Sequence, residues 1–260
     1  MSDPGTSERS AREWAELLRR NWEARASLPS RDLFVASHPG WNDPVAWERH
    51  ARTELELFLM DLNATWIREA DVLEIGCGSG RLAPFLRPHV RSYTGFDISQ
   101  GMVDAARRRC DGMEGFRFFR GDGLGVPEPA RDREYRLALA IAVFIHCPRE
   151  VIAANVESAF AHLAPGGQLR FQLLADTEDR EGLVGTSSNT QKATDSVASA
   201  AKDMIAALTE EERRWVFDAY YMGHRFRYGE TEPFLAGLTG GRVALYRADL
   251  ASIYGLVEKG

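Results

Sequence analysis

The chain has 260 residues, 44% of them hydrophobic, which fits one α/β domain with additions or two small domains. The net charge of −6 argues against a basic surface for nucleic acid. The sequence has no apolar run of membrane-spanning length, and it starts with the polar stretch MSDPGTSERS. Three well-separated cysteines, at 77, 110 and 147, fit neither a zinc site nor a disulfide framework. We therefore expect a cytoplasmic monomer or homodimer without a metal ion.

The first 68 residues (1–68) are expected to form an N-terminal helical cap, with helices over 8–28 and 44–67. Asp43 and Pro44 are typical of a helix start, because aspartate caps the first turn and proline suits the first helical position. The loop between the two helices carries His38 and Trp41. We expect these two side chains either to close over a bound substrate or to lie in an ordinary surface loop.

From residue 71 strands and helices alternate, which is typical of a doubly wound parallel sheet covered on both faces. Strands are predicted over 71–76, 92–97, 115–120, 135–143 and 166–175. Helices are predicted over 79–87, 99–110 and 149–163, and Ser99 can cap the second of them. The stretch YRLALAIAV at 135–143 is apolar almost throughout, as a central parallel strand should be. Residues 69–176 are therefore expected to form the core of the fold.

The pattern changes after this core. Residues 176–200 are polar with few apolar anchors, which predicts a mobile loop or lid, and a helix at about 210–222 follows. We expect the insertion 177–230 as a whole to cover the site and hold the substrate. Residues 231–260 are predicted to contain a helix at 231–238 and strands at 242–248 and 251–258. These strands must form an antiparallel hairpin, because too few residues separate them for a crossover.

The stretch VLEIGCGSGR at residues 72–81 places Gly76, Gly78 and Gly80 directly after the first predicted strand. Glycine loses the most backbone entropy on folding, so this pattern indicates unusual dihedral angles, close approach of the backbone to a ligand, or both. Dinucleotide sites use the spacing G-x-G-x-x-G, but Arg81 stands at the third glycine position here. The spacing instead favours a ligand with an adenosine and an amino-acid tail, which needs no phosphate nest.

Two acids follow at the ends of later strands. Asp97 ends the second strand, about 20 residues on, where dinucleotide-binding folds place an acid on the ribose hydroxyls. Asp122 ends the third strand, in FRFFRGDGLG. A carboxylate there can accept from the adenine amino group, and the backbone N–H of Gly123 or Leu124 can meet a ring nitrogen.

Residues 72–176 resemble the class I S-adenosylmethionine-dependent methyltransferases. The matching stretches are VLEIGCGSGR, YTGFDISQGMVDAAR, FRGDGL, IAVFIHCP and HLAPGGQLRFQLL, in this order. The resemblance implies methyl transfer from S-adenosylmethionine and a Rossmann-like seven-stranded sheet in the order 3-2-1-4-5-7-6, with one antiparallel strand. Arg136 departs from the family pattern, which often has an aspartate near the start of the fourth strand. That position is usually structural, so the cofactor assignment is unaffected.

The resemblance also implies a set of cofactor-binding residues. By this carry-over Glu74, Gly76, Gly78 and Gly80 line the methionine part of the cofactor, and Asp97 holds the ribose. Ile98 and Met102 pack near the adenosine, and Ile141 lies where the fourth strand passes the ligand. Asp122, Gly123 and Leu124 contact the adenine.

The methyl acceptor is expected to be a small molecule. The fourth strand ends in AIAVFIH, without the acids of a magnesium-dependent catechol-type enzyme, and neither an N-P-P-Y-type nor a CxxxCxxC motif occurs. Oxygen is the expected acceptor atom, in secondary metabolism, with nitrogen, carbon and sulfur as alternatives. Two further classes stay open: a non-catalytic S-adenosylmethionine-binding partner protein, and a nicotinamide oxidoreductase, which the glycine spacing disfavours.

His146 is the candidate general base. It follows the fourth strand on the ligand side of the sheet, and histidine titrates near neutral pH. In the resembled family a histidine at this place is often a structural hydrogen-bonding group, so both roles stay open. The segment DAYYMGHRFRY supplies a second set of candidates, which either build the substrate pocket or pack into the core: Tyr220, Tyr221, His224 and Arg225.

Overall fold

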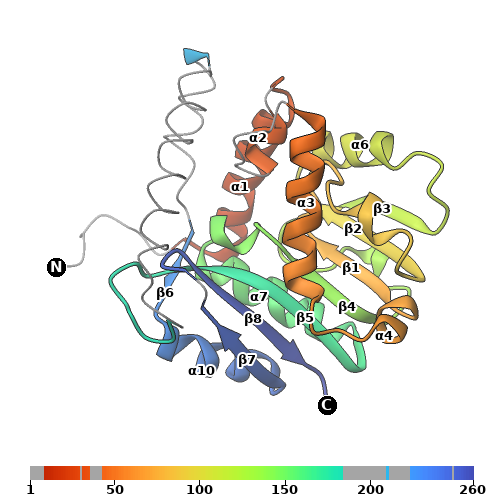
Figure 1. The fold of residues 1–260 in the computed structure, drawn as a ribbon. Coiled ribbons are helices and arrows are strands. Elements are labelled where there is room, and N and C mark those ends of the chain that lie inside the picture. Colours follow the sequence, from red (N-terminus) through yellow and green to blue (C-terminus); the bar gives the residue numbers. More distant parts are fainter. Residues whose placement is uncertain (1–8, 30, 36–42, 184–208, 211–222, 248) are drawn as a thin grey trace.

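The computed structural model describes residues 9–29, 31–35, 43–183, 209–210, 223–247 and 249–260, and Figure 1 shows their arrangement. The strands are β1 (Asp71–Ile75), β2 (Ser92–Asp97), β3 (Phe116–Arg120), β4 (Tyr135–Ala140), β5 (Leu163–Ala175), β6 (Arg225–Phe226), β7 (Arg242–Tyr246) and β8 (Ser252–Glu258). The helices are α1 (Ala11–Ala26), α2 (Arg31–Val35), α3 (Pro44–Leu59), α4 (Ala64–Arg68), α5 (Ala83–Leu86), α6 (Gln100–Arg109), α7 (Arg149–Ala161) and α10 (Tyr228–Thr239). Two 3₁₀ turns, η1 (Glu128–Ala130) and η2 (Phe144–His146), follow β3 and β4.

The strands form one sheet in the order β3-β2-β1-β4-β5-β8-β7. β1 to β5 run parallel, and β8 runs antiparallel to both β5 and β7. This is the predicted α/β order, because β7 and β8 take the sixth and seventh places once the short β6 is set aside. The predicted terminal hairpin is confirmed. β6 is an addition that the sequence did not indicate: it pairs in parallel with Leu174 and Ala175 at the end of β5.

Helices cover both faces of the sheet, with α3 on one side and α7 on the other (Figure 1). Side chains alternate between the faces along each strand: Leu137 and Leu139 of β4 pack with α3, α5 and α6, whereas Ala138 and Ala140 pack with α7 and α10. Full burial of each large aliphatic side chain stabilises the fold by about 1.5–3 kcal/mol. Burial on two faces explains why the predicted strands read as apolar runs without polar alternation.

Helix caps follow the predictions at two sites. The Asp43 carboxylate accepts from the Val45 N–H at 2.9 Å, and the Ser99 hydroxyl accepts from the Met102 N–H at 3.2 Å. A cap that the sequence analysis missed divides the predicted helix 44–67. The Asn63 side chain accepts from the Thr65 N–H at 2.8 Å, so α3 ends at Leu59 and α4 starts afresh.

Two predicted elements are shorter than expected, and both flank the glycine turn. The predicted helix 79–87 is reduced to Ala83–Leu86, with a proline in its first turn. The predicted strand 135–143 ends at Ala140, because Ala142 adopts a left-handed conformation with φ 58° and directs the chain into η2. Most of the predicted lid and of the helix at 210–222 lies outside the described residues.

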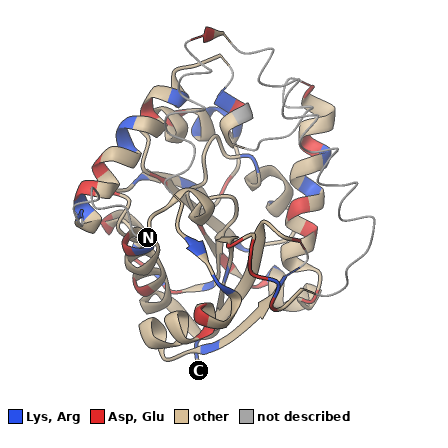
Figure 2. Cartoon of the chain, turned by 90° about the vertical axis from the view of Figure 1, so that its left-hand side faces the viewer, with Lys and Arg blue, Asp and Glu red and all other residues tan. Residues whose placement is uncertain are grey.

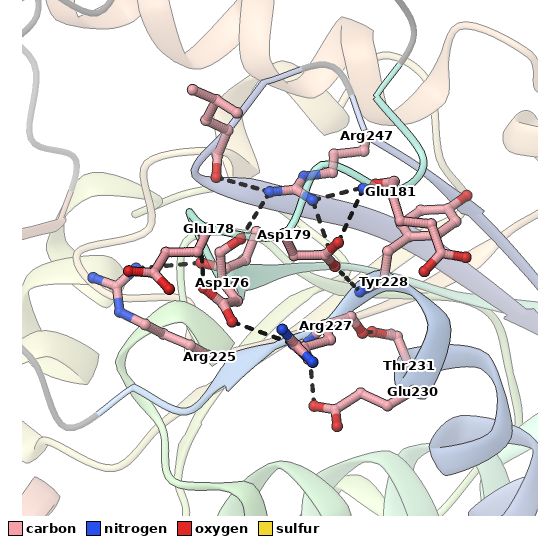
Figure 3. Close-up of polar contacts among 12 residues, drawn as sticks. Asp176, Glu178, Asp179, Glu181, Arg225, Arg227, Tyr228, Glu230, Thr231 and Arg247 are labelled. Carbon is pink, nitrogen blue, oxygen red and sulfur yellow. Dashed lines mark hydrogen bonds and ion pairs between the residues drawn. The ribbon is translucent and has the colours of Figure 1, made fainter. Parts of the chain in front are cut away.

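The described chain after β5 meets the β7–β8 connection at the buried side chain of Arg247, which is 0% exposed (Figure 3). Its three guanidinium nitrogens donate to four backbone carbonyl oxygens at 3.0–3.2 Å, those of Asp176, Glu181, Asp249 and Leu250. These carbonyls belong to the chain after β5 and to the β7–β8 connection. We call this arrangement the Arg247 clasp.

Asp179 completes the Arg247 clasp from the other side. Its carboxylate accepts from the backbone N–H groups of Tyr228 at 2.7 Å and Glu181 at 2.9 Å, and it lies 3.8 Å from Arg247 (Figure 3). The bond from Tyr228 is the main reason why the pKa of Asp179 is lowered. The start of α10 is thereby joined to the chain that leaves β5.

Charges of both signs are interspersed along the outer helices of the described chain (Figure 2). This distribution agrees with the modest net charge of the sequence. Among the described helices, none combines the length and the hydrophobicity that crossing a bilayer requires.

Candidate functional site

A pocket opens at the carboxyl ends of β1, β2 and β4, where ligands bind in open α/β sheets. It brings together seven of the predicted cofactor residues: Glu74, Gly76, Gly78, Asp97, Ile98, Gly123 and Ile141. Further lining residues come from α1, α2 and α7, from the end of the glycine turn and from the chain around η2: Leu18, Trp22, Val35, Arg81, Ala142, Val143, Phe144, Cys147 and Asn155. The pocket therefore joins segments that are up to 137 residues apart, from Leu18 to Asn155.

The glycine turn needs glycine for its dihedral angles and for the available space. Gly76, Gly78 and Gly80 have φ values of +64°, +51° and +75°, in the left-handed region. A Cβ atom on Gly76 would lie 2.5 Å from a methyl carbon of Val143 across the pocket. A Cβ on Gly80 would lie 3.0 Å from the backbone of Ala106 in α6. The first glycine thus opens the pocket, and the third lets the turn pack against α6.

Asp97 is buried at the end of β2 with its carboxylate directed to the glycine turn. Oδ2 accepts from the Gly78 N–H and Oδ1 from the Ser99 N–H, both at 2.9 Å. Burial raises the pKa of Asp97 to about 6. A carboxylate has about four lone-pair sites, and its backbone partners do not use all of them, so acceptor capacity remains for a ligand. The pair of hydroxyls on a ribose fits this remaining capacity.

Glu74 and Arg81 place two buried charges of opposite sign beside the same turn. The Glu74 carboxylate accepts a hydrogen bond from the Tyr93 hydroxyl. Burial raises the pKa of Glu74 to about 7, and Arg81 acts in the opposite direction. Near neutral pH Glu74 is therefore ready to ionise when a cationic ligand group arrives.

The loop after β3 forms another wall of the pocket. Gly123 has a φ of +84°, and its carbonyl oxygen accepts from the Asn155 side chain at 2.7 Å. Asn155 also donates to the Val151 carbonyl at 2.8 Å, so α7 holds this loop in place. Asp122 is exposed, and its carboxylate accepts from the Leu124 N–H at 2.9 Å. Asp122 and Leu124 flank Gly123 beside the pocket, but neither is among the described residues that line it.

Helices α1 and α2 supply the apolar cover of the pocket, through Leu18, Trp22 and Val35. α1 is attached to the start of α6, where the Glu23 carboxylate accepts from the Gln100 N–H at 2.8 Å and the Gly101 N–H at 3.2 Å. These lining residues were not predicted from the sequence. The signal was available, because Leu18 and Trp22 are four residues apart and share one helix face.

Two predicted cofactor-binding residues, Met102 and Gly80, are packed against other parts of the protein. Met102 is fully buried in α6, and Gly80 packs against Ala106; among the described residues neither lines the pocket. Their predicted contact with a cofactor remains a prediction. Asn155 and Arg81 are polar lining residues that the analysis did not assign, although a lone asparagine amid the apolar stretch VIAANV was a usable signal.

The candidate base His146 lies in η2, half-buried, with its ring edge-on to Trp22 and the ring centroids 5.6 Å apart. His224 is nearby, because its backbone N–H donates to the Cys147 carbonyl at 3.0 Å. Burial is the main reason why the pKa of His224 is lowered. Arg225 is exposed and donates to the Ala175 carbonyl at 3.2 Å. The other predicted substrate residues lie outside the described part of the chain: His38, Trp41, Tyr220 and Tyr221.

Comparisons with known proteins agree with this geometry. Residues 72–167 match the family model of a methyltransferase domain. This segment of the chain thus matches a methyltransferase domain, and the sheet has the order expected for the class I methyltransferase fold. The matched segment runs from β1 into β5 and contains the glycine turn, Asp97 and the Gly123 loop. No curated protein matches the sequence.

Several solved structures share the fold of this chain, including the segments outside residues 72–167. The complex of DhpI with SAH has a TM-score of 0.59 at 20% identity, over 95% of this chain and 97% of that one. The N-methyltransferase NodS from Bradyrhizobium japonicum WM9, in complex with S-adenosyl-L-homocysteine, scores 0.54 at 16% identity, over 93% and 97%. An O-methyltransferase family protein from Burkholderia thailandensis scores 0.55 at 14% identity, over 96% and 71%. At these identities the likeness establishes the fold.

Proposed function

We propose that this chain is a cytoplasmic S-adenosylmethionine-dependent methyltransferase that methylates a small molecule, on oxygen, in secondary metabolism. The observation that carries the proposal is the buried Asp97 carboxylate, which spans the glycine turn and keeps lone pairs free inside the pocket. S-adenosylhomocysteine bound to similar structures supports the choice of ligand.

The residues present fit this cofactor. Asp97 would hold the ribose hydroxyls, and Glu74 lies where a cationic amino group can ionise it. Gly76 and Gly78 leave room for the tail, and the loop at Gly123 would border the adenine together with Ile98. When bound, S-adenosylmethionine supplies an electrophilic methyl group on a sulfonium.

The protein contributes position and a water-poor enclosure. Trp22, Leu18 and Val35 cover the pocket with apolar surface, so water is kept from the reacting atoms. Holding an acceptor close and in line can in principle supply about 7–11 kcal/mol of the barrier. A carboxylate acceptor needs no more than this, whereas an alcohol or a phenol must also lose a proton.

His146 is our candidate for that proton transfer. Its ring packs on Trp22, which lines the pocket, so it lies beside the covered face of the site. A general base typically contributes about 10²–10⁴-fold to the rate. We expect His146→Ala to lower turnover by about this factor and to leave the affinity for S-adenosylhomocysteine nearly unchanged. Near-normal turnover and an unchanged pH profile in the folded variant would remove His146 from the mechanism.

The proposal is tested by turnover with a panel of acceptors. The purified chain is incubated with S-adenosylmethionine and phenols, alcohols, carboxylic acids, amines or thiols, and formation of S-adenosylhomocysteine is measured by mass spectrometry. Methylation of the oxygen acceptors would support the proposal, and methylation of amines or thiols alone would reassign the acceptor atom. Tight cofactor binding without turnover on any acceptor would instead favour a non-catalytic partner protein.

A further inference from the structure

Arg81 is a buried arginine with unused hydrogen-bond donors inside the pocket. Its side chain is 3% exposed, and Nη2 forms an ion pair with Glu54 of α3. The guanidinium also lies over the ring of Trp47, 5.9 Å from its centroid. Nε and Nη1 are buried, and neither has a hydrogen-bond partner among the described residues. One nitrogen thus holds the group in place, and two nitrogens remain available.

Unused donors of this kind are unusual, because native proteins satisfy nearly all buried polar groups. Two other buried arginines of this chain obey the rule. Arg247 uses all three nitrogens on carbonyl oxygens, and Arg170 uses all three on Phe58, Asp61 and Gln168. Arg81 is distinguished from both by its position, because it lines the pocket.

The surroundings of Arg81 indicate the chemistry of the missing partner. Arg81 is close enough to Glu74 to lower the pKa of that carboxyl, and both lie beside Gly76 and Gly78. One buried anion and one buried cation next to a glycine turn complement a zwitterion. An α-amino acid group carries a cationic ammonium and an anionic carboxylate, and arginine is well suited to bind carboxylates.

We propose that Arg81 binds the carboxylate of the amino-acid tail of S-adenosylmethionine and thereby makes the pocket selective for adenosyl ligands that carry this tail. The inference rests on the proposed cofactor. Glu54 has a positioning role: its carboxylate holds the guanidinium at the turn. Arg81 stands where dinucleotide sites have their third glycine, so one position both disfavours a pyrophosphate loop and recognises the tail.

The test compares two ligands that differ in the tail. S-adenosylhomocysteine has the amino-acid group, and 5′-methylthioadenosine lacks it. Dissociation constants are measured by calorimetry for wild type and Arg81→Gln. Loss of a charge-assisted hydrogen bond should weaken S-adenosylhomocysteine by about 10- to 100-fold, and 5′-methylthioadenosine should change by less than about 3-fold. Arg170→Gln is the matched control, since it removes a buried arginine outside the pocket and should change neither constant.

Two further variants keep the test decisive if Arg81→Gln folds poorly. Arg81→Lys retains a positive charge and should give a smaller, still tail-specific loss. Glu54→Gln with Arg81→Gln removes both partners, so no unpaired, partly buried carboxylate remains. Equal weakening of both ligands in these variants would make Arg81 a structural residue and overturn the inference. If wild type binds neither ligand, the proposed cofactor itself is wrong, and the inference falls with it.

Discussion

Arg81 and Arg247 are both buried, but Arg81 follows the central strand β1 and Arg247 follows the edge strand β7, and the two side chains are paired in different ways. Arg247 donates from every nitrogen to backbone carbonyls and closes the clasp between β5, α10 and the β7–β8 connection. Arg81, which lines the pocket, pairs through one nitrogen, and its other two nitrogens have no hydrogen-bond partner among the described residues. Complete internal pairing marks a structural arginine, and incomplete pairing at a pocket marks a group that awaits a ligand.

The two regions also differ in what burial does to their acids. In the Arg247 clasp, Asp179 has a lowered pKa because two backbone N–H groups bind its carboxylate. In the pocket, Glu74 and Asp97 have raised pKa values because burial outweighs their partners. The clasp is thus stable by itself, whereas the pocket holds charges that a ligand would stabilise.

The largest effect is expected from breaking the clasp. Arg247→Met leaves four carbonyl oxygens without their buried donor and Asp179 without its ion-pair partner, so the free energy of unfolding should fall by about 3–5 kcal/mol. Urea unfolding measures this loss. The control Arg242→Gln removes an exposed ion pair with Glu258 at the same edge of the sheet and should change stability by less than about 1 kcal/mol. A loss as small as the control's would show that the clasp is dispensable.

Removing the carboxylate of the pocket comes next. Asp97→Ala should weaken binding of S-adenosylhomocysteine by about 1.5–3 kcal/mol, since two ribose hydroxyls lose a charged acceptor. Calorimetry on the folded variant measures the change. Asp104→Ala, on the exposed face of α6, is the control and should bind as wild type does. Wild-type affinity in Asp97→Ala would withdraw the ribose assignment.

A smaller effect is expected in the pH dependence of stability. The pKa values of Glu74 and Asp97 are about 7 and about 6 in the ligand-free fold, above their ordinary values of 4.5 and 3.8. Both groups therefore favour the fold when protonated, and this contribution is lost as pH rises from about 4 through about 7. Relative to wild type, the isosteric variant Glu74→Gln should lose about 1–3 kcal/mol less between these limits. Parallel unfolding curves for the two proteins across this range would contradict the raised pKa of Glu74.

The smallest effect concerns Asp122, which is exposed beside the pocket. If its solvent-exposed carboxylate accepts a hydrogen bond from the adenine amino group, Asp122→Ala should weaken the binding of S-adenosylhomocysteine by about 0.5–1 kcal/mol. A matched ligand without that amino group, the inosine analogue, should bind both proteins equally. An identical loss of affinity for both ligands would mean that the substitution acts through the backbone turn at Leu124, because the Asp122 carboxylate also accepts from the Leu124 N–H.

The strands, the helix caps and the glycine turn could be predicted because they depend on local signals, whereas the strand order was implied by the family resemblance. Apolar runs, glycine spacing and caps such as Ser99 act over a few residues. Asp97 was also predictable, because it follows a strand at a characteristic distance. The contacts of Arg81, Trp22 and Arg247 could not be predicted, because each joins segments that are far apart in the chain. The partners of Arg247 are backbone carbonyl oxygens, which no residue type in the sequence marks.

The end of β4 is a second feature that the sequence pattern alone could not predict. Its sequence continues as a strand to residue 143, but the left-handed Ala142 ends it early and places Val143 against Gly76. Nothing in an apolar run marks such a turn. The boundary is set by the packing of the pocket, which propensity does not describe.

Titration of the purified ligand-free chain with S-adenosylhomocysteine and, separately, with NAD⁺ tests the central claim most directly, because the two ligands share an adenosine and differ in tail and pyrophosphate. We predict that S-adenosylhomocysteine binds at one site per chain, that Asp97→Ala weakens it by about tenfold or more, and that NAD⁺ gives no measurable heat. Binding of NAD⁺ without binding of S-adenosylhomocysteine would contradict the account.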